Sequence, residues 1–196
     1  MVQYKAPVKD IKFLMNDVYN FQEHYQTIPG GDEATPEMVD MILEAAASFS
    51  EDVVAPLYQS GDDGCTFDNG EVTTPKGFKE AYAQYVEGGW QSMATPVEYG
   101  GQGLPMSLAL AKSEMIGTAN WSWGMYPGLS LGAMNTIWMH GTEEQKQEFF
   151  VPLSDGRWMG TMCLTEPQCG TDLGQVKTKA EPNADGSFNI TGTKIF

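Results

Sequence analysis

The hydrophobic pattern of this chain changes period once, at Asp155-Gly156, and this change constrains the fold class more than any other feature. Before it, apolar residues recur every three or four positions, as they do on one face of an α-helix. After it, short apolar runs and alternating residues are separated by turn residues, which is typical of β-strands. The sequence therefore predicts a mainly α protein that continues into a partial β domain.

The helical part is divided by proline, glycine and capping residues. We expect helices in six stretches: 7–29, 35–55, 75–87, 104–118, 121–139 and 142–153. Thr35 followed by Pro36 is a favourable helix start, and Thr142 with Gln145 predicts a capping box. Residues 60–74 are polar and rich in turn residues, so they predict a surface loop. The second helix is expected to bury one apolar stripe, made of Met38, Met41, Ile42, Ala45, Phe49 and Val53.

The C-terminal part predicts short strands at 158–164, 176–180, 187–191 and 193–196, with a turn at 183–186. Strands without closing partners would leave unpaired edges and an uncovered apolar face. We therefore expect the chain to be the N-terminal part of a longer protein. Its predicted domains are an extension at 1–34, a helical domain at 35–157 and an incomplete β domain at 158–196.

Composition excludes several classes of function. The formal charge is −15, from 11 basic and 26 acidic residues, which disfavours binding to nucleic acid or to an anionic membrane. No apolar run has the length of a membrane span or a signal peptide. Three cysteines without a CxxC pair favour a reducing, cytoplasmic compartment. His24 and His140 have no second ligand at metal-binding spacing, so no metal site is predicted.

Four motifs follow one another across about 100 residues. They are MCLTEPQCGTD at 162–172, PVEYGGQG at 96–103, GTEEQK at 141–146 and GTKIF at 192–196. Together they resemble the acyl-CoA dehydrogenase family, in the same order and spacing. The N-terminal YKAPVKDIKF at 4–13 resembles a longer-chain branch that includes the 3-methylmercaptopropionyl-CoA dehydrogenases.

The resemblance implies an N-terminal helical bundle followed by the first strands of an antiparallel, β-barrel-like middle domain. It also implies FAD as cofactor and α,β-dehydrogenation of an acyl-CoA thioester. Flavin contacts are expected from Met162, Cys163, Leu164, Thr165, Gly170, Thr171 and Phe196. Substrate contacts are expected from Thr171, Trp123, Gly124 and Pro127.

The same resemblance places the catalytic base, a glutamate, in a C-terminal domain that this sequence lacks. No catalytic residue is therefore assigned, and the chain alone is expected to be inactive. For the full-length protein the resemblance implies an electron-transfer flavoprotein as partner and a homo-oligomeric state. Phe196 stands where the family usually has Trp, so it keeps an apolar ring but lacks the indole N–H.

Ordinary structural roles compete with these assignments. Thr165, Gly170 and Thr171 also suit a simple turn, and Trp123 on an apolar helix also suits a core position. Glu166 is expected to hold the turn rather than to transfer protons. Two other functions remain open: an acyl-CoA oxidase that uses O₂, and a non-catalytic helical binding module if the chain naturally ends at Phe196.

Overall fold

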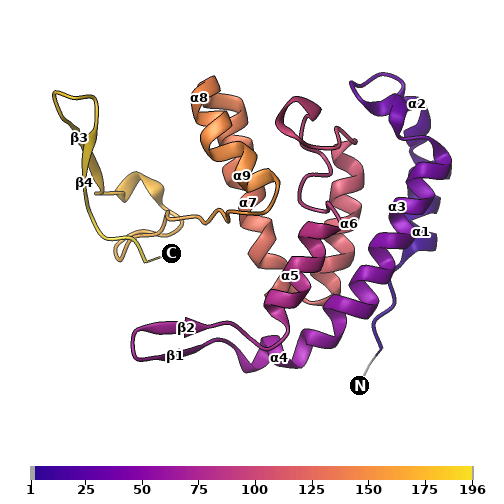
Figure 1. Ribbon diagram of the computed structural model, residues 1–196, viewed down its shortest axis with the longest axis horizontal. Helices are drawn as coiled ribbons and strands as arrows, with labels where there is room; N and C mark the ends of the chain where they lie inside the picture. Colours follow the sequence, from indigo (N-terminus) through magenta and orange to yellow (C-terminus); the bar gives the residue numbers. More distant parts are fainter. Residues whose placement is uncertain (1–2, 196) are drawn as a thin grey trace. The chain divides into compact units, whose positions relative to one another are not determined.

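The protein forms two compact units in the computed structural model, which describes residues 3–195. The first unit runs through Gly160 and is helical, apart from one hairpin (Figure 1). The second unit begins at Thr161 and carries two antiparallel strands. The predicted fold class, mainly α followed by a partial β domain, is confirmed.

The first unit is built around one helix, α6, which packs against α3 and against α7 (Figure 1). Although α7 has 20 residues, no helix within residues 3–195 is long and apolar enough to cross a membrane. The α-helices within residues 3–195 are α1 (Val8–Phe13), α2 (Phe21–Tyr25), α3 (Pro36–Phe49), α4 (Tyr58–Asp63), α5 (Phe78–Glu87), α6 (Met106–Ala119), α7 (Trp121–His140), α8 (Glu143–Gln145) and α9 (Val151–Ser154).

Both predicted helix starts are confirmed by their hydrogen bonds. The Thr35 hydroxyl accepts the backbone N–H of Met38 at 3.3 Å. At α8, the backbone N–H of Gln145 donates to the Thr142 hydroxyl at 3.3 Å, and the Thr142 N–H donates to the Gln145 side chain at 2.9 Å. These bonds satisfy backbone donors that the first helical turn leaves without partners.

The predicted apolar stripe of α3 is only partly correct, because Phe49 is buried as expected but Ala45 is exposed. Met38 and Met41 are exposed, and the buried face instead contains Val39, Leu43 and the pair Ala46-Ala47. Both faces of this helix carry apolar residues, so spacing alone did not separate them. The face with small alanines is the one that packs in the core with α6, since small side chains allow two helices to approach closely.

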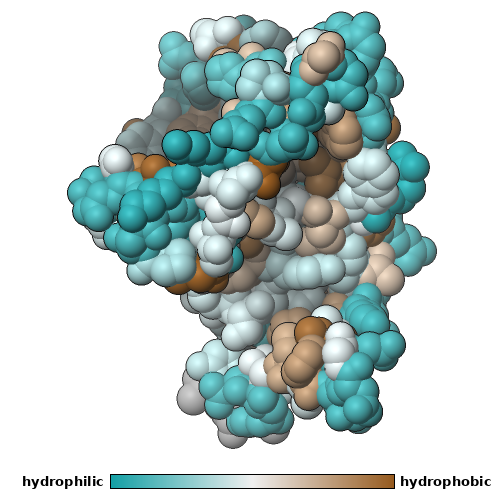
Figure 2. All heavy atoms as spheres, turned by 90° about the vertical axis from the view of Figure 1, so that its left-hand side faces the viewer, coloured by the Kyte–Doolittle hydropathy of each residue, from teal (hydrophilic) through white to brown (hydrophobic). Residues whose placement is uncertain are grey.

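Residues 60–74, predicted as a surface loop, contain regular secondary structure. Helix α4 continues to Asp63, and a hairpin follows, with β1 (Thr66–Asp68) antiparallel to β2 (Glu71–Thr73). Its turn is the Asn69-Gly70 pair, whose φ angles of 50° and 87° are those of a two-residue hairpin turn. Phe67 and Val72 lie opposite each other and are exposed. Figure 2 shows hydrophobic surface beside hydrophilic residues at the bottom of the molecule.

The second unit contains β3 (Lys179–Pro182) paired antiparallel with β4 (Phe188–Thr191) around the predicted turn. The predicted strand at 158–164 is wrong, because no strand of the described residues pairs with it. The stretch 193–195 likewise forms no strand, and Phe196 lies outside the described residues. An apolar run becomes a strand only where a neighbouring strand takes its hydrogen bonds.

Leu108 and Leu110 on α6 provide a matched test of this packing. Leu108 is fully buried beside Leu43 and Met115, whereas Leu110 is 62% exposed. Leu108→Ala should lower the free energy of unfolding by about 2–5 kcal/mol, because it removes buried methyl groups and leaves a cavity. Leu110→Ala should change it by less than about 0.5 kcal/mol. Urea unfolding followed by circular dichroism measures both, and equal losses would contradict this placement of α6.

Candidate functional site

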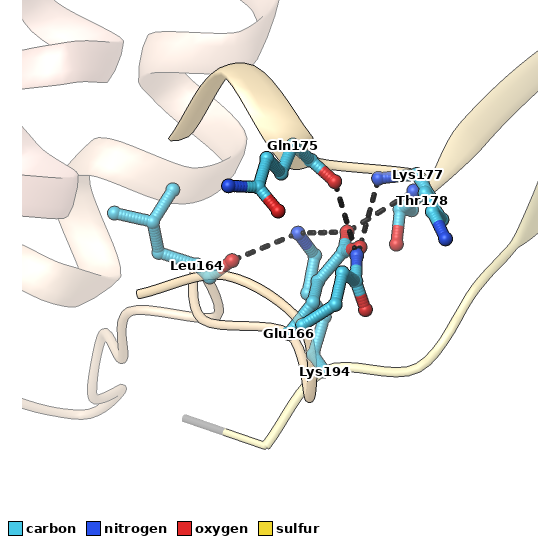
Figure 3. Close-up of polar contacts among 7 residues, drawn as sticks. Leu164, Glu166, Gln175, Lys177, Thr178 and Lys194 are labelled. Atoms are coloured by element: carbon cyan, nitrogen blue, oxygen red, sulfur yellow. Dashed lines mark hydrogen bonds and ion pairs between the residues drawn. The ribbon is translucent and has the colours of Figure 1, made fainter. Parts of the chain in front are cut away.

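The segment 164–178 of the second unit is organised by one buried carboxylate, that of Glu166 (Figure 3). Glu166 and Cys169 exchange two backbone hydrogen bonds of 3.0 Å, which closes a tight turn over Pro167-Gln168. The Glu166 side chain is only 3% exposed and points to the chain segments that follow this turn. The prediction that Glu166 holds the turn is confirmed.

Four donors surround the Glu166 carboxylate. The backbone N–H groups of Lys177 and Thr178 donate to it at 2.8 and 3.0 Å, and the Lys194 ammonium does so at 2.9 Å. The Gln168 amide is the fourth donor. A buried carboxylate is stable only when its lone pairs are satisfied in this way. Glu166 therefore ties together three stretches of chain that lie up to 28 residues apart.

The same donors determine the charge state of Glu166. Its pKa lies well below the usual range because the Thr178 side chain, the Lys177 N–H and the Lys194 ammonium favour the ionised form. Among residues 3–195 the buried Thr178 hydroxyl has no hydrogen-bond partner of good geometry, so its effect on this pKa comes from its position near the carboxylate. Glu166 remains a carboxylate at neutral pH, as a structural acceptor should.

Lys194 and its neighbour fix the residues just before the turn. The Lys194 ammonium also donates to the Leu164 carbonyl at 3.0 Å, and the Ile195 N–H donates to the Thr165 carbonyl at 2.9 Å. Gly192 makes this approach possible, since a Cβ there would lie 2.1 Å from the Thr178 hydroxyl oxygen. The sequence analysis did not single out Lys194, which lies 28 residues from its partner.

The segment before the turn presents unused hydrogen-bond donors. Met162, Cys163 and Leu164 are exposed. Among the residues described, none accepts a hydrogen bond from the backbone N–H groups of 162–165. The carbonyls of Leu164 and Thr165 are bonded, so this backbone is held while its donors stay available.

The turn also brings two predicted site residues together. A Cβ built on Gly170 would lie 4.0 Å from the Thr165 methyl group, with no other atom nearer. The two residues therefore flank one open space, which any larger side chain at 170 would begin to fill. Thr171 follows and is exposed. Phe196, the last predicted contact, lies outside the described residues.

The predicted substrate residues belong to the first unit, where they separate into two groups. Gly124 and Pro127 line a cavity of about 340 Å³ next to α6 and α7. Trp123 is fully buried instead, and its indole N–H donates to the Phe78 carbonyl at 3.3 Å. Of the two roles expected for Trp123, a substrate contact or a core position, its packing is that of a core residue. The same cavity is lined by Lys112, which the sequence analysis passed over although it interrupts an apolar run.

Comparison with known families tests the resemblance directly. The family described as acyl-CoA dehydrogenase, N-terminal domain, matches residues 36–157. The chain belongs to the acyl-CoA dehydrogenase family. The match covers the helical stretch from the start of α3 to just beyond α9.

Individual acyl-CoA dehydrogenases match almost the whole chain. The 3-methylmercaptopropionyl-CoA dehydrogenase of Ruegeria pomeroyi is 39% identical over 98% of this chain, and the match covers 33% of that protein. The broad-specificity linear acyl-CoA dehydrogenase FadE5 of Mycobacterium tuberculosis is 32% identical over 100% of this chain, with 32% of its own length matched. The chain thus spans about a third of the length of these relatives.

The fold agrees with a solved acyl-CoA dehydrogenase structure. Butyryl-CoA dehydrogenase from Megasphaera elsdenii superposes with a TM-score of 0.68 at 28% identity, over 83% of this chain and 41% of that one. A Bacillus anthracis acyl-CoA dehydrogenase complexed with FAD gives 0.67 at 25% identity, over 83% of this chain and 26% of that one. The predicted membership, including the similarity to the 3-methylmercaptopropionyl-CoA branch, is confirmed.

Glu166→Gln tests whether the carboxylate holds its neighbours. The substitution keeps the shape but turns an NH₂ group toward donors, so at least one buried N–H loses its acceptor. We expect the amide protons of Lys177 and Thr178 to exchange with solvent at least about tenfold faster at pH 7. Hydrogen exchange followed by NMR measures this, with Glu181→Gln on the exposed strand β3 as the control. Unchanged exchange in Glu166→Gln would contradict the role of the carboxylate.

The lowered pKa of Glu166 predicts a pH dependence with a definite sign. The pKa of a glutamate in an unfolded chain is about 4.3. Because its folded pKa is lower, the stabilisation from Glu166 is fully present above that value and is lost as the pH falls through the folded pKa. The ¹³C shift of its carboxyl carbon should therefore stay that of the ionised form from pH 7 down to about 4. A midpoint at or above 4.3 would rule this out.

Proposed function

We propose that the full-length protein catalyses FAD-dependent α,β-dehydrogenation of an acyl-CoA thioester. In this proposal the present chain supplies the flavin-facing turn and part of the wall around the acyl chain. The observation that carries it is the turn at 165–170, which Glu166 and Lys194 hold while the N–H groups before it stay unused. Family membership supplies the reaction class.

The residues of the turn fit a flavin by the chemistry of their donors. A bound FAD would supply the acceptor for the hydride that leaves the β-carbon of the thioester, while a base takes the α-proton and the α,β double bond forms. The backbone N–H groups of 162–165 and the Thr165 hydroxyl can donate hydrogen bonds to the flavin ring. Such bonds would stabilise the negative charge that the ring gains on reduction. The open space beside Gly170 admits a flat ring close to the backbone. In this proposal the exposed Thr171 hydroxyl donates to the cofactor or to the thioester.

The cavity beside α6 and α7 fits the apolar part of the substrate. Gly124 and Pro127 line it together with apolar side chains, and a fatty chain is stabilised by leaving water. Trp123 supports this wall from the core, where the centroid of its ring lies 5.5 Å from that of the Tyr85 ring. Its contribution in the proposal is therefore to position the wall.

The rest of the protein enters the proposal through the family. The division into an extension at 1–34, a helical domain at 35–157 and a β domain from 158 is the domain organisation we propose. The catalytic base is a glutamate beyond this chain, so the chain alone is inactive. We further propose a homo-oligomer that passes electrons to an electron-transfer flavoprotein.

The proposed function is tested by titrating the full-length protein with hexanoyl-CoA under anaerobic conditions. The absorbance of an oxidised flavin at about 450 nm should bleach as the substrate is dehydrogenated. A yellow protein that does not bleach with acyl-CoA thioesters would contradict the reaction, and a colourless protein would contradict the cofactor. In air, roughly one peroxide per turnover would identify the oxidase instead.

The contribution of Thr165 is tested by Thr165→Val. Loss of one hydroxyl donor should weaken FAD binding by roughly 2- to 10-fold, the usual range for a neutral hydrogen bond. Fluorescence titration of the apoprotein with FAD measures the change. Thr191→Val on the exposed strand β4 is the matched control and should bind FAD as the unmodified protein does. Equal affinity in both variants would remove Thr165 from the site.

A further inference from the structure

Lys112 on α6 is a buried lysine. The residue is 2% exposed, and among residues 3–195 no carboxylate forms an ion pair with its ammonium. Burial lowers the pKa of Lys112 to about 8. Lysine is rarely fully buried unless it is paired, because the charge loses its hydration. This position therefore calls for an explanation.

Two of the three N–H donors of the ammonium have partners inside the protein. One donates to the Tyr85 hydroxyl at 2.8 Å, and another to the Trp90 carbonyl at 3.2 Å. Tyr85 is itself fixed in the core, with its ring packed against those of Phe49 and Trp123. The ammonium is thus held by rigid acceptors, and one of its donors is left over.

Lys112 is also one of the residues that line the cavity containing Gly124 and Pro127. Most of the other lining is apolar, with Ile116 and Met125 as examples. A third N–H turned toward this cavity would find no acceptor in an alkyl chain. A chain that ends in an oxygen would supply one, and the lysine has already lost its hydration before the chain arrives.

We propose that Lys112 is a specificity-determining residue that selects acyl-CoA thioesters whose acyl chain carries a carboxylate or carbonyl oxygen near its distal end. The inference rests on the proposed function, since it assumes that this cavity receives the acyl chain. A hydrogen bond to a charged donor is stronger than one between neutral groups. In this proposal the Lys112 ammonium distinguishes an oxygen-bearing acyl chain from a plain alkyl chain.

The competing explanation is that Lys112 has only a structural role. In that case its hydrogen bonds join α6 to Tyr85 on α5 and to Trp90 just after α5. A joining role predicts that loss of the ammonium lowers stability and affects all acyl substrates equally. A selecting role predicts a change in the ratio between substrates. The ratio of kcat/KM values therefore separates the two, whatever happens to stability.

The experiment uses the full-length protein and length-matched thioesters of six and eight carbons. Adipoyl-CoA and 5-oxohexanoyl-CoA are compared with hexanoyl-CoA, and the corresponding eight-carbon set with octanoyl-CoA. For at least one oxygen-bearing thioester, the kcat/KM ratio to its alkyl counterpart should exceed one. In Lys112→Met, which keeps the volume but removes the donors, this ratio should fall at least about tenfold.

Two further variants act as controls. Lys76→Met removes an exposed lysine of the same unit and should leave every ratio unchanged. Tyr85→Phe keeps the ammonium and frees another of its donors, so the preference for oxygen-bearing thioesters should persist. If Lys112→Met does not fold, the kcat/KM ratios of the unmodified protein and of Tyr85→Phe still test the inference, because both proteins should prefer an oxygen-bearing thioester.

Two outcomes would overturn the inference, and they are distinguishable. If hexanoyl-CoA and octanoyl-CoA are turned over but no oxygen-bearing thioester is preferred by the unmodified protein, Lys112 does not select the substrate and the proposed function stands. The same holds if the ratios survive in Lys112→Met. If no thioester is bound or turned over, the proposed function and this inference fail together.

Discussion

The burial of α6 on most of its circumference is the constraint on which the helical unit depends. Only every fourth residue of the helix is exposed, namely Met106, Leu110, Glu114 and Thr118. The remaining faces contribute Leu108 and Met115 to one core cluster and Ile116 and Ala119 to the other. Because both clusters are built on α6, its position determines where α3 and α7 lie, and with them the wall of the cavity.

The two capped helix starts followed from the local sequence, whereas the packing of the helices did not. Thr35 and Thr142 cap helices through bonds within four residues, so the sequence alone predicts them. The rotation of α3 depends on which apolar face meets α6, and α3 has two such faces. The hairpin turn at Asn69-Gly70 carried a strong local signal that was overlooked. The strand expected at 158–164 depends on a neighbouring strand, which no local pattern reports.

The candidate site shows the same division. The family motif indicated candidate flavin contacts within Met162–Thr171, and Glu166 was expected to hold the turn. The donors that satisfy Glu166 come from Lys177, Thr178 and Lys194, and the last of these lies 28 residues away. Such a contact arises from the three-dimensional path of the chain, so residue types and spacing do not reveal it. Lys112 was missed for a similar reason, since only the fold shows that it is buried.

Glu166 and Lys112 are both buried charges, and their difference explains what each is for. Glu166 has four donors from its own chain, so its charge is satisfied without any ligand and serves the local structure. Lys112 has two acceptors for three donors, and no carboxylate of residues 3–195 forms an ion pair with it. A charge that the protein satisfies completely needs nothing from outside, whereas one left partly unsatisfied at the wall of a cavity favours a ligand that completes it.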